Sequence, residues 1–187
     1  MTSIYTYTPL SRSTPRLMSR HPSAWGDIPT ILPDIIERFG VPTASALEFG
    51  TEFGYSTSAL ANYFERVTGV DTFLGDFMTG HKADHFQMTS QDLAPWPNIT
   101  LVQSSYQDYV AGRDDRHGLI HIDIVHTYED TYACGEWSVA HADVVIFHDT
   151  ESFPQVKHAC ADLATRHGLE FHNYPHSHGL GILVRRR

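Results

Sequence analysis

The sequence predicts an α/β fold in which a mostly parallel β-sheet is covered by helices on both faces. Three observations lead to this prediction. Short apolar runs recur along the 187 residues, helical segments of about ten residues separate them, and polar or glycine-containing turns follow several runs. Strands of a parallel sheet are buried on both faces and therefore form continuous apolar runs. Their alternation with helices is typical of repeated βαβ units.

The first thirty residues look irregular, because no apolar run stands out and four prolines interrupt them: Pro9, Pro15, Pro22 and Pro29. We predict an irregular N-terminal arm over residues 1–30 and a single domain over residues 31–187. The arm could cover a site or a partner, or it could be a loose terminus. The sequence leaves both alternatives open.

A first helix is predicted over residues 33–40, where Pro33 stands near the start, Asp34 in the first turn and Gly40 at the end. This is the usual order of helix signals. Further helices are expected at residues 56–64, 85–93, 128–139 and 156–167, and strands at residues 44–49, 67–70, 99–102, 119–122, 144–147, 169–174 and 181–184. Only a few residues join the last two strands, so this pair should form an antiparallel hairpin.

The segment between residues 72 and 97 is the longest connection, and its length suggests a function. Residues 75–87 could fold over a substrate as a lid, or they could be a solvated loop.

The composition is that of an ordinary soluble domain, with 41% hydrophobic and 19% charged residues. A formal net charge of −9 disfavours binding to nucleic acid or to an anionic membrane. Neither a secretory signal nor a membrane span is recognisable, and Cys134 and Cys160 fall in helical segments. We therefore expect a cytoplasmic protein with a small-molecule partner. A homo-oligomer could complete the pocket, since 187 residues leave little chain beyond the core.

The turn after the first predicted core strand carries the strongest functional signal. Gly50 and Gly54 allow the backbone to approach a ligand, and the helix that follows offers free N–H groups. Tyr55 and Ser56 would cap this helix and face the pocket. Asp71 ends the second core strand about twenty residues later, where it could accept hydrogen bonds from ribose hydroxyls. The alternative is that both glycines only permit a tight strand–helix turn.

The spacing of this turn favours an adenosine-type cofactor over a dinucleotide. The dinucleotide fingerprint is G-x-G-x-x-G, whereas Glu48 precedes Gly50 here and the next glycine is Gly54. A carboxylate disfavours a pyrophosphate but suits a cofactor with an amino group and a positive sulfonium. S-adenosylmethionine is therefore the first choice and a nicotinamide dinucleotide the second. Glu48 is expected to meet the amino group of the cofactor, or else to brace the turn.

Four stretches resemble a known family, and they read ALEFGTEFGYS at 46–56, GVDTFLGD at 69–76, IDIVHTYED at 122–130 and VIFHD at 145–149. The first resembles the cofactor motif of class I S-adenosylmethionine-dependent methyltransferases. The later ones are similar to the branch of macrocin O-methyltransferases and cephalosporin-hydroxylase-like proteins, of the methyltransferase family 24 type. The similarity covers residues 33–184. It implies a Rossmann-like, seven-stranded, mostly parallel sheet with an antiparallel last strand.

The second half of the site is predicted at the ends of two neighbouring strands, because strands that stop at one edge bring their following side chains together. These side chains are Asp123, His126, His148 and Asp149. A divalent cation could bind an acceptor hydroxyl and lower its pKa, and a histidine or carboxylate could take the proton. Asp123 and Asp149 suit Mg²⁺, while imidazole ligands suit a transition metal better.

The resemblance implies a Mg²⁺ site with an acid at Asp123 and an acidic pair where this sequence has His148 and Asp149. It also implies an acidic base where Val125 stands, so we assign the base to His126. Three interpretations stay open: a metal site formed by Asp123, His148 and Asp149, a metal-free acid–base site of His126 and Asp149, and a structural network. His121, deeper in its strand, is expected to pack in the core.

The sequence thus predicts an O-methyltransferase that uses S-adenosylmethionine, with Mg²⁺ as an optional second cofactor, to methylate a hydroxyl of a sugar or natural product. Ser105 and Tyr106, after the third core strand, should border the adenine, although this segment could also be a plain helix start. The predicted catalytic residues are Asp123, His126 and Asp149. The predicted cofactor-binding residues are Glu48, Gly50, Thr51, Gly54, Tyr55, Ser56, Asp71, Thr72, Ser105, Tyr106 and Asp123. The alternatives are an inactive S-adenosylmethionine-binding protein and a metal-dependent hydrolase or hydroxylase.

Overall fold

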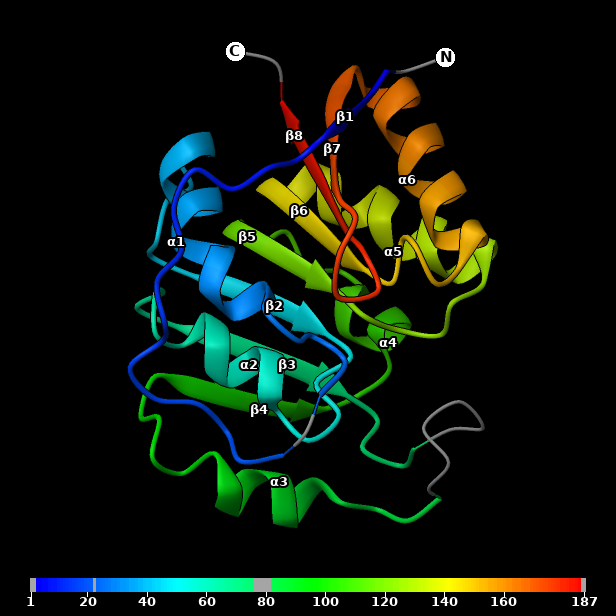
Figure 1. Ribbon diagram of the computed structural model, residues 1–187. Helices are drawn as coiled ribbons and strands as arrows, with labels where there is room; N and C mark the ends of the chain where they lie inside the picture. The colour runs from blue at the N-terminus through cyan, green and yellow to red at the C-terminus, as the bar shows by residue number, and fades with distance from the viewer. Residues whose placement is uncertain (1–2, 22, 76–81, 186–187) are drawn as a thin grey trace.

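The computed structural model describes residues 3–21, 23–75 and 82–185. Within them, eight strands form one sheet in the order β1-β7-β8-β6-β5-β2-β3-β4 (Figure 1). Every neighbouring pair is parallel except the two pairs that β8 makes with β6 and β7. The predicted fold class, with its antiparallel last strand, is confirmed. The strands are β1 (Ile4–Thr6), β2 (Ala46–Phe49), β3 (Val67–Asp71), β4 (Ile99–Gln103), β5 (His117–Ile122), β6 (Ala142–His148), β7 (Leu169–Tyr174) and β8 (Leu180–Arg185).

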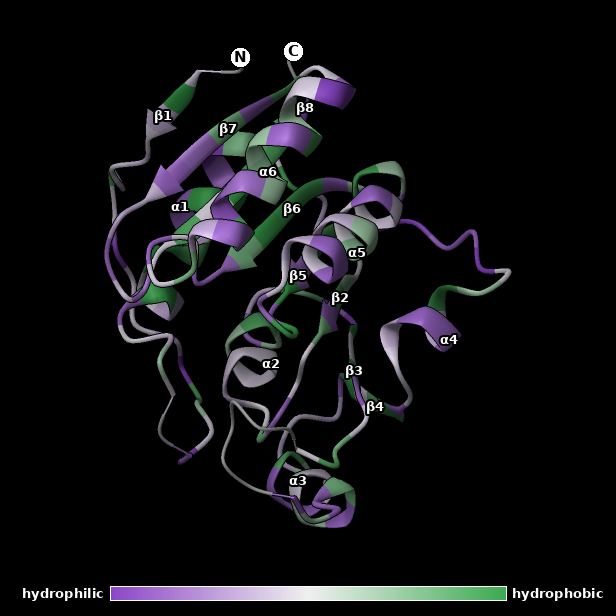
Figure 2. Cartoon of the chain, turned by 90° about the vertical axis from the view of Figure 1, so that its right-hand side faces the viewer, coloured by the Kyte–Doolittle hydropathy of each residue, from purple (hydrophilic) through white to green (hydrophobic). Residues whose placement is uncertain are grey.

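Helices cover both faces of the sheet and bury a hydrophobic core against each. One face carries α1 (Ile28–Phe39) and α2 (Tyr55–Leu60), and the other carries α4 (Tyr106–Val110), α5 (Tyr128–His141) and α6 (Pro154–His167). The short helix α3 (Phe86–Asp92) lies beyond β4 at the edge of the sheet (Figure 1). Figure 2 shows that the central strand β6 is mostly hydrophobic, as expected of a strand buried on both faces.

The predicted helix at residues 33–40 starts five residues earlier than expected, at Ile28. Its buried residues Ile28, Ile31, Leu32 and Ile35 follow the helical spacing, so the apolar face continues upstream of Pro33. The expected end is confirmed, because Gly40 adopts the left-handed conformation with φ of 60°.

The N-terminal arm is packed onto the domain, and it contributes an edge strand that the sequence did not predict. Strand β1 pairs with β7, and the arm then runs along the face that carries α1 and α2 (Figure 1). Tyr7 donates a hydrogen bond to the carboxylate of Asp34, and burial together with this carboxylate raises the pKa of the phenol. Trp25 is 1% exposed. The arm is therefore held by core contacts rather than loose.

A second attachment of the arm centres on the carboxylate of Asp27. It accepts hydrogen bonds from the hydroxyls of Tyr174 and Ser177, both at 2.6 Å, and from the guanidinium of Arg12 at 2.5 Å. Burial raises the pKa of Asp27, but these three donors outweigh it, so the net pKa is below its ordinary value. The arm and the β7–β8 turn therefore share one anchor.

Of the candidate lid at residues 75–87, residues 76–81 lie outside the described part of the chain. None of the helices among the described residues combines the length and apolar character that a membrane span requires.

Candidate active site

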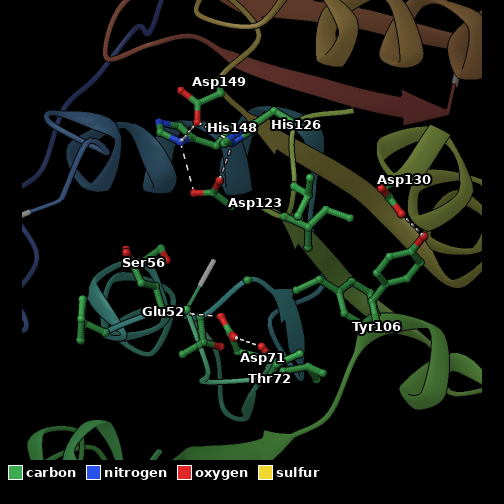
Figure 3. Close-up of a pocket in the computed structure, with 18 of the residues that line it drawn as sticks. Glu52, Ser56, Asp71, Thr72, Tyr106, Asp123, His126, Asp130, His148 and Asp149 are labelled. Atoms are coloured by element: carbon green, nitrogen blue, oxygen red, sulfur yellow. Dashed lines mark hydrogen bonds and ion pairs between the residues drawn. The ribbon is translucent and has the colours of Figure 1, made fainter. Parts of the chain in front are cut away.

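A pocket of about 790 Å³ opens at the carboxyl ends of the parallel strands, where ligands bind in open α/β sheets. Its walls come from the segments that follow β2, β3, β4, β5 and β6, from residues 23–24 of the arm, and from the β7–β8 turn. In Figure 3 the side chains of Asp123, His126, His148 and Asp149 gather on one side of this cavity, while Asp71 and Thr72 lie on the other.

The glycine turn after β2 brings the ends of two strands into close contact. Gly50 has a φ of 90°, and a Cβ added to it would lie 1.7 Å from the carbonyl oxygen of Asp123. Gly54 has a φ of 78° and begins α2, and a Cβ there would lie 2.4 Å from Leu93. Both glycines are therefore required by the turn itself. Gly50 and Thr51 also line the pocket, whereas Gly54 does not. The hydroxyl of Thr51 is buried and has no hydrogen-bond partner among the described residues.

Asp71 faces this turn from the end of β3. Its carboxylate accepts hydrogen bonds from the backbone N–H of Glu52 at 2.8 Å and of Phe73 at 2.7 Å. A carboxylate has about four acceptor sites, so two backbone donors leave capacity for the hydroxyls of a ligand. Thr72, Tyr55 and Ser56 border the same space, as predicted. These residues fit the ribose and amino-acid ends of an adenosine-type cofactor.

Glu48 is placed differently from the prediction that it meets the cofactor. It is fully buried beneath the turn and does not line the pocket. Its carboxylate accepts a hydrogen bond from the hydroxyl of Thr57 and lies 2.8 Å from Nδ1 of His121. The geometry therefore supports the alternative, in which Glu48 braces the turn. His121 packs in the core as expected, with no exposed surface.

Two residues, Ser105 and Tyr106, were predicted to border the adenine. Ser105 caps α4 by accepting a hydrogen bond from the N–H of Asp108 at 3.1 Å. Tyr106 lines the pocket, and its hydroxyl donates to the carboxylate of Asp130 at 3.2 Å. Burial and the nearby Asp130 raise the pKa of Tyr106 to about 12.

The cluster of Asp123, His126, His148 and Asp149 forms as predicted. Nδ1 of His148 lies 3.2 Å from a carboxylate oxygen of Asp123 and 3.3 Å from one of Asp149. Nε2 of His126 lies 2.9 Å from Asp149 and 3.5 Å from Asp123. Ligand atoms of Asp123, His148 and Asp149 all lie within 4.8 Å of one another, a spacing at which they could hold a metal ion. Asp149 also has a φ of 65°, a rare backbone conformation at which functional residues concentrate.

A family model described as a methyltransferase domain, of family 24, matches residues 47–150. The chain belongs to this methyltransferase family. The resemblance to class I S-adenosylmethionine-dependent methyltransferases is thereby confirmed. No curated protein matches the sequence at a significant level.

Several solved structures with the same fold are named as O-methyltransferases, and another, NodS from Bradyrhizobium japonicum, is named as an N-methyltransferase. NovP superimposes with a TM-score of 0.66 at 13% identity, over 81% of this chain and 75% of its own. A candidate O-methyltransferase from Klebsiella pneumoniae gives 0.61 at 13% identity, over 91% and 84%. The O-methyltransferase from Bacillus cereus in complex with SAH gives 0.53 at 16% identity, over 81% and 77%. At these identities the likeness establishes the fold.

The histidines and aspartates of the methyltransferase domain shift one another's pKa values strongly. Burial would lower the pKa of both histidines, but the carboxylates outweigh it and raise the pKa of His126 to about 9 and of His148 to about 10. Burial would raise the pKa of both aspartates, but the imidazoles hold the pKa of Asp149 at about 2 and that of Asp123 far below its usual value. Without another cation, the cluster therefore consists of two imidazolium groups and two carboxylates.

The contacts in this cluster are ion pairs rather than well-formed hydrogen bonds. Nδ1 of His148 and Nε2 of His126 are buried, and neither points along a hydrogen bond to a partner among the described residues. Nε2 of His148, in contrast, donates to the carbonyl oxygen of Ser177 at 3.1 Å. The ring of His126 stacks on Phe153, with centroids 4.1 Å apart and planes 10° from parallel. Both rings are thus held in place from outside the cluster.

Several pocket residues of the methyltransferase domain were not predicted. Ser23 and Ala24 come from the arm, His178 from the β7–β8 turn and Phe153 from the start of α6. Asp130 lies in the first turn of α5 and could have been suspected, because it follows Thr127 at the spacing of a helix cap. Nothing local in the sequence indicates the other four.

Proposed function

We propose that this methyltransferase transfers a methyl group from S-adenosylmethionine to a hydroxyl of a small acceptor of the sugar or natural-product type. One observation carries the proposal: the cluster of Asp123, His126, His148 and Asp149 borders the same pocket as the glycine turn and Asp71. Methyl transfer to oxygen needs a cofactor site and, beside it, groups that orient a hydroxyl and accept its proton. Oxygen is our choice of acceptor atom because four of the structural neighbours are named as O-methyltransferases and one as an N-methyltransferase.

The cofactor side of the proposal rests on residues that line the pocket. S-adenosylmethionine would supply an electrophilic methyl group at this position. The backbone of Gly50 lines the pocket, and Asp71 has acceptor capacity for hydroxyls of the ribose. Tyr106, with Asp130 behind it, would border the adenine.

On the acceptor side, the carboxylates of Asp123 and Asp149 would orient the hydroxyl. His126 is the more exposed of the two imidazoles, with 17% of its side chain accessible against 2% for His148. We propose His126 as the residue that receives the proton as the oxygen attacks. Because the carboxylates outweigh burial and raise its pKa to about 9, His126 can do so only as the neutral imidazole, which is present above that pH or when a cation neutralises the carboxylates. Asp149, 2.9 Å from it, and the stacked ring of Phe153 hold it in place. These residues exclude water from one side of the reacting oxygen and fix its direction of attack.

The cofactor half is tested by isothermal titration with S-adenosylhomocysteine. We expect one site per chain and a loss of at least about tenfold in affinity for Asp71→Asn, because the amide would replace one of the acceptor oxygens by a donor. Absence of binding to the folded wild type would contradict the proposal.

The catalytic half is tested with labelled S-adenosylmethionine and a panel of hydroxylated acceptors. His126→Gln should lower kcat by about 10²-fold or more while the affinity for S-adenosylhomocysteine stays unchanged. Normal cofactor binding without transfer to any acceptor would instead favour a binding protein that has lost catalysis. Turnover of a substrate without the cofactor would favour a metal-dependent hydrolase or hydroxylase.

A further inference from the structure

The direction of the His148 ring is fixed by the β7–β8 turn. Because the carbonyl oxygen of Ser177 can only accept, Nε2 of His148 must carry the hydrogen that bridges their 3.1 Å contact. In the neutral ring, Nδ1 then carries a lone pair. This lone pair faces carboxylate oxygens of Asp123 and Asp149 at 3.2 and 3.3 Å. Three electron-rich atoms at this separation repel one another unless a cation lies between them.

The geometry distinguishes a metal ion from a proton as that cation. A proton on Nδ1 of His148 would point along one of its contacts, yet neither contact has the direction of a hydrogen bond. Atoms that share a metal at about 2.1 Å are separated by about 3.0 Å at a right angle and about 3.4 Å at a tetrahedral angle. The separations from Nδ1 to Asp123 and Asp149 fall inside that range. Nε2 of His126 also lies close to these ligand atoms, 2.9 Å from a carboxylate oxygen of Asp149.

The family resemblance implies a divalent cation at this place, and Asp123, His148 and Asp149 fit one. We propose that the imidazole of His148, which stands where the resemblance implies an acid, makes this site prefer a transition metal such as Mn²⁺ or Co²⁺ to Mg²⁺. Mg²⁺ prefers oxygen ligands and gives up its water reluctantly, whereas imidazole nitrogen suits the later divalent metals. The buried ring of His148, 3% exposed, is held toward the site by the carbonyl of Ser177, as metal-binding histidines commonly are. The inference deepens the proposed function, since it concerns the acceptor side of the same pocket.

Metal binding can be measured without cofactor or acceptor, so the two proposals can fail separately. Chelator-treated, dialysed protein is titrated with MnCl₂, and bound Mn²⁺ is followed by loss of the free-ion signal in electron paramagnetic resonance. We expect one Mn²⁺ per chain and at least about tenfold more Mg²⁺ than Mn²⁺ to occupy half of the sites in competition. Titration of the same sample with S-adenosylhomocysteine reports on the cofactor half independently.

Three variants assign the bound ion to this cluster. Asp123→Asn should abolish stoichiometric Mn²⁺ binding, and His148→Asp should reduce the preference for Mn²⁺ over Mg²⁺ at least about tenfold, because it makes all the ligands oxygen. His178→Gln is the matched control, since His178 lines the pocket but is absent from the three-residue group, and it should change neither value. Thermal melts identify any variant that has lost its fold, and the Asp123 and His148 variants provide two independent routes.

The inference is overturned by any of three results. One is the absence of stoichiometric Mn²⁺ binding to folded wild-type protein up to millimolar concentration. A second is equal competition by Mg²⁺. The third is evidence that the ion is held outside the cluster, given either by an unchanged metal preference in folded His148→Asp or by an equal loss of binding in His178→Gln.

Discussion

Replacing Glu48 by glutamine separates two roles for the acid beneath the cofactor turn. Glu48 and His121 are both fully buried, and the carboxylate bonds both the His121 ring and the hydroxyl of Thr57. Glutamine has nearly the same shape but keeps only one acceptor oxygen, so one of these two partners loses its acceptor. A hydrogen bond to a charged group contributes about 1.5–3 kcal/mol. For a domain of this size, each kcal/mol shifts Tm by about 2–4 °C, so a loss of about 2 kcal/mol should lower Tm by about 4–8 °C.

Scanning calorimetry and titration with S-adenosylhomocysteine are the two assays. If Glu48 braces the turn, Glu48→Gln should lower Tm as calculated, while its affinity at 15 °C should stay within about threefold of the wild type. Thr57→Val is the matched variant, because it removes the hydroxyl on the other side of the same hydrogen bond without changing side-chain size. It should show the same pattern with a smaller drop in Tm. An unchanged Tm with an affinity at least about tenfold weaker in Glu48→Gln alone would refute this reasoning and restore a direct contact with the cofactor.

Three further predictions concern the turn and the arm. Gly50→Ala should prevent folding or abolish binding of S-adenosylhomocysteine, because its Cβ would meet the Asp123 carbonyl oxygen at 1.7 Å. The control is Gly112→Ala, which is also at positive φ but has open space around it. It should lower the free energy of unfolding, measured by chemical denaturation, by only about 1 kcal/mol. Trp25→Ala should lower the free energy of unfolding by about 3–5 kcal/mol, and a value below about 1 kcal/mol would show that the arm is not part of the core. Since the folded pKa of Asp27 is depressed, its stabilisation is present above the unfolded pKa near 4 and is lost as pH falls through the lower folded value. Hydrogen exchange in the arm should therefore accelerate as pH falls below about 4, after correction for intrinsic rates, and less so in an Asp27→Asn variant.

The sheet could be predicted from the sequence because its strands are buried on both faces and appear as apolar runs. Strand β1 could not, since its three residues are exposed and its strand partner β7 lies more than 160 positions away. The start of α1 was missed because Pro29 resembles a loop residue, although proline is well tolerated in the first turn of a helix. In both cases the deciding information is tertiary packing.

The candidate site also contains residues that the sequence could place and residues that it could not. Residues that directly follow a parallel strand, such as Asp71 and Asp123, could be placed because the sheet brings strand ends to one edge. Glu48 could not, because it lies inside β2, where successive side chains point to opposite faces. Leu47 and Phe49 pack against α4, α5 and α6, so Glu48 points toward α2 and away from the cofactor edge. The sequence shows the alternation but not which face each set occupies.

The arm connects the two halves of the pocket. The ring of Trp25 packs edge-on against His121, with centroids 4.7 Å apart, and its centroid is 6.3 Å from that of His148. His121 bonds the acid that braces the cofactor turn, and His148 belongs to the acidic cluster on the acceptor side. Since Ser23 and Ala24, just before Trp25, line the pocket itself, a displacement of this segment would disturb both histidines and open one wall. The N-terminal arm is therefore part of the proposed active site, and it provides a wall that residues 31–185 alone would lack.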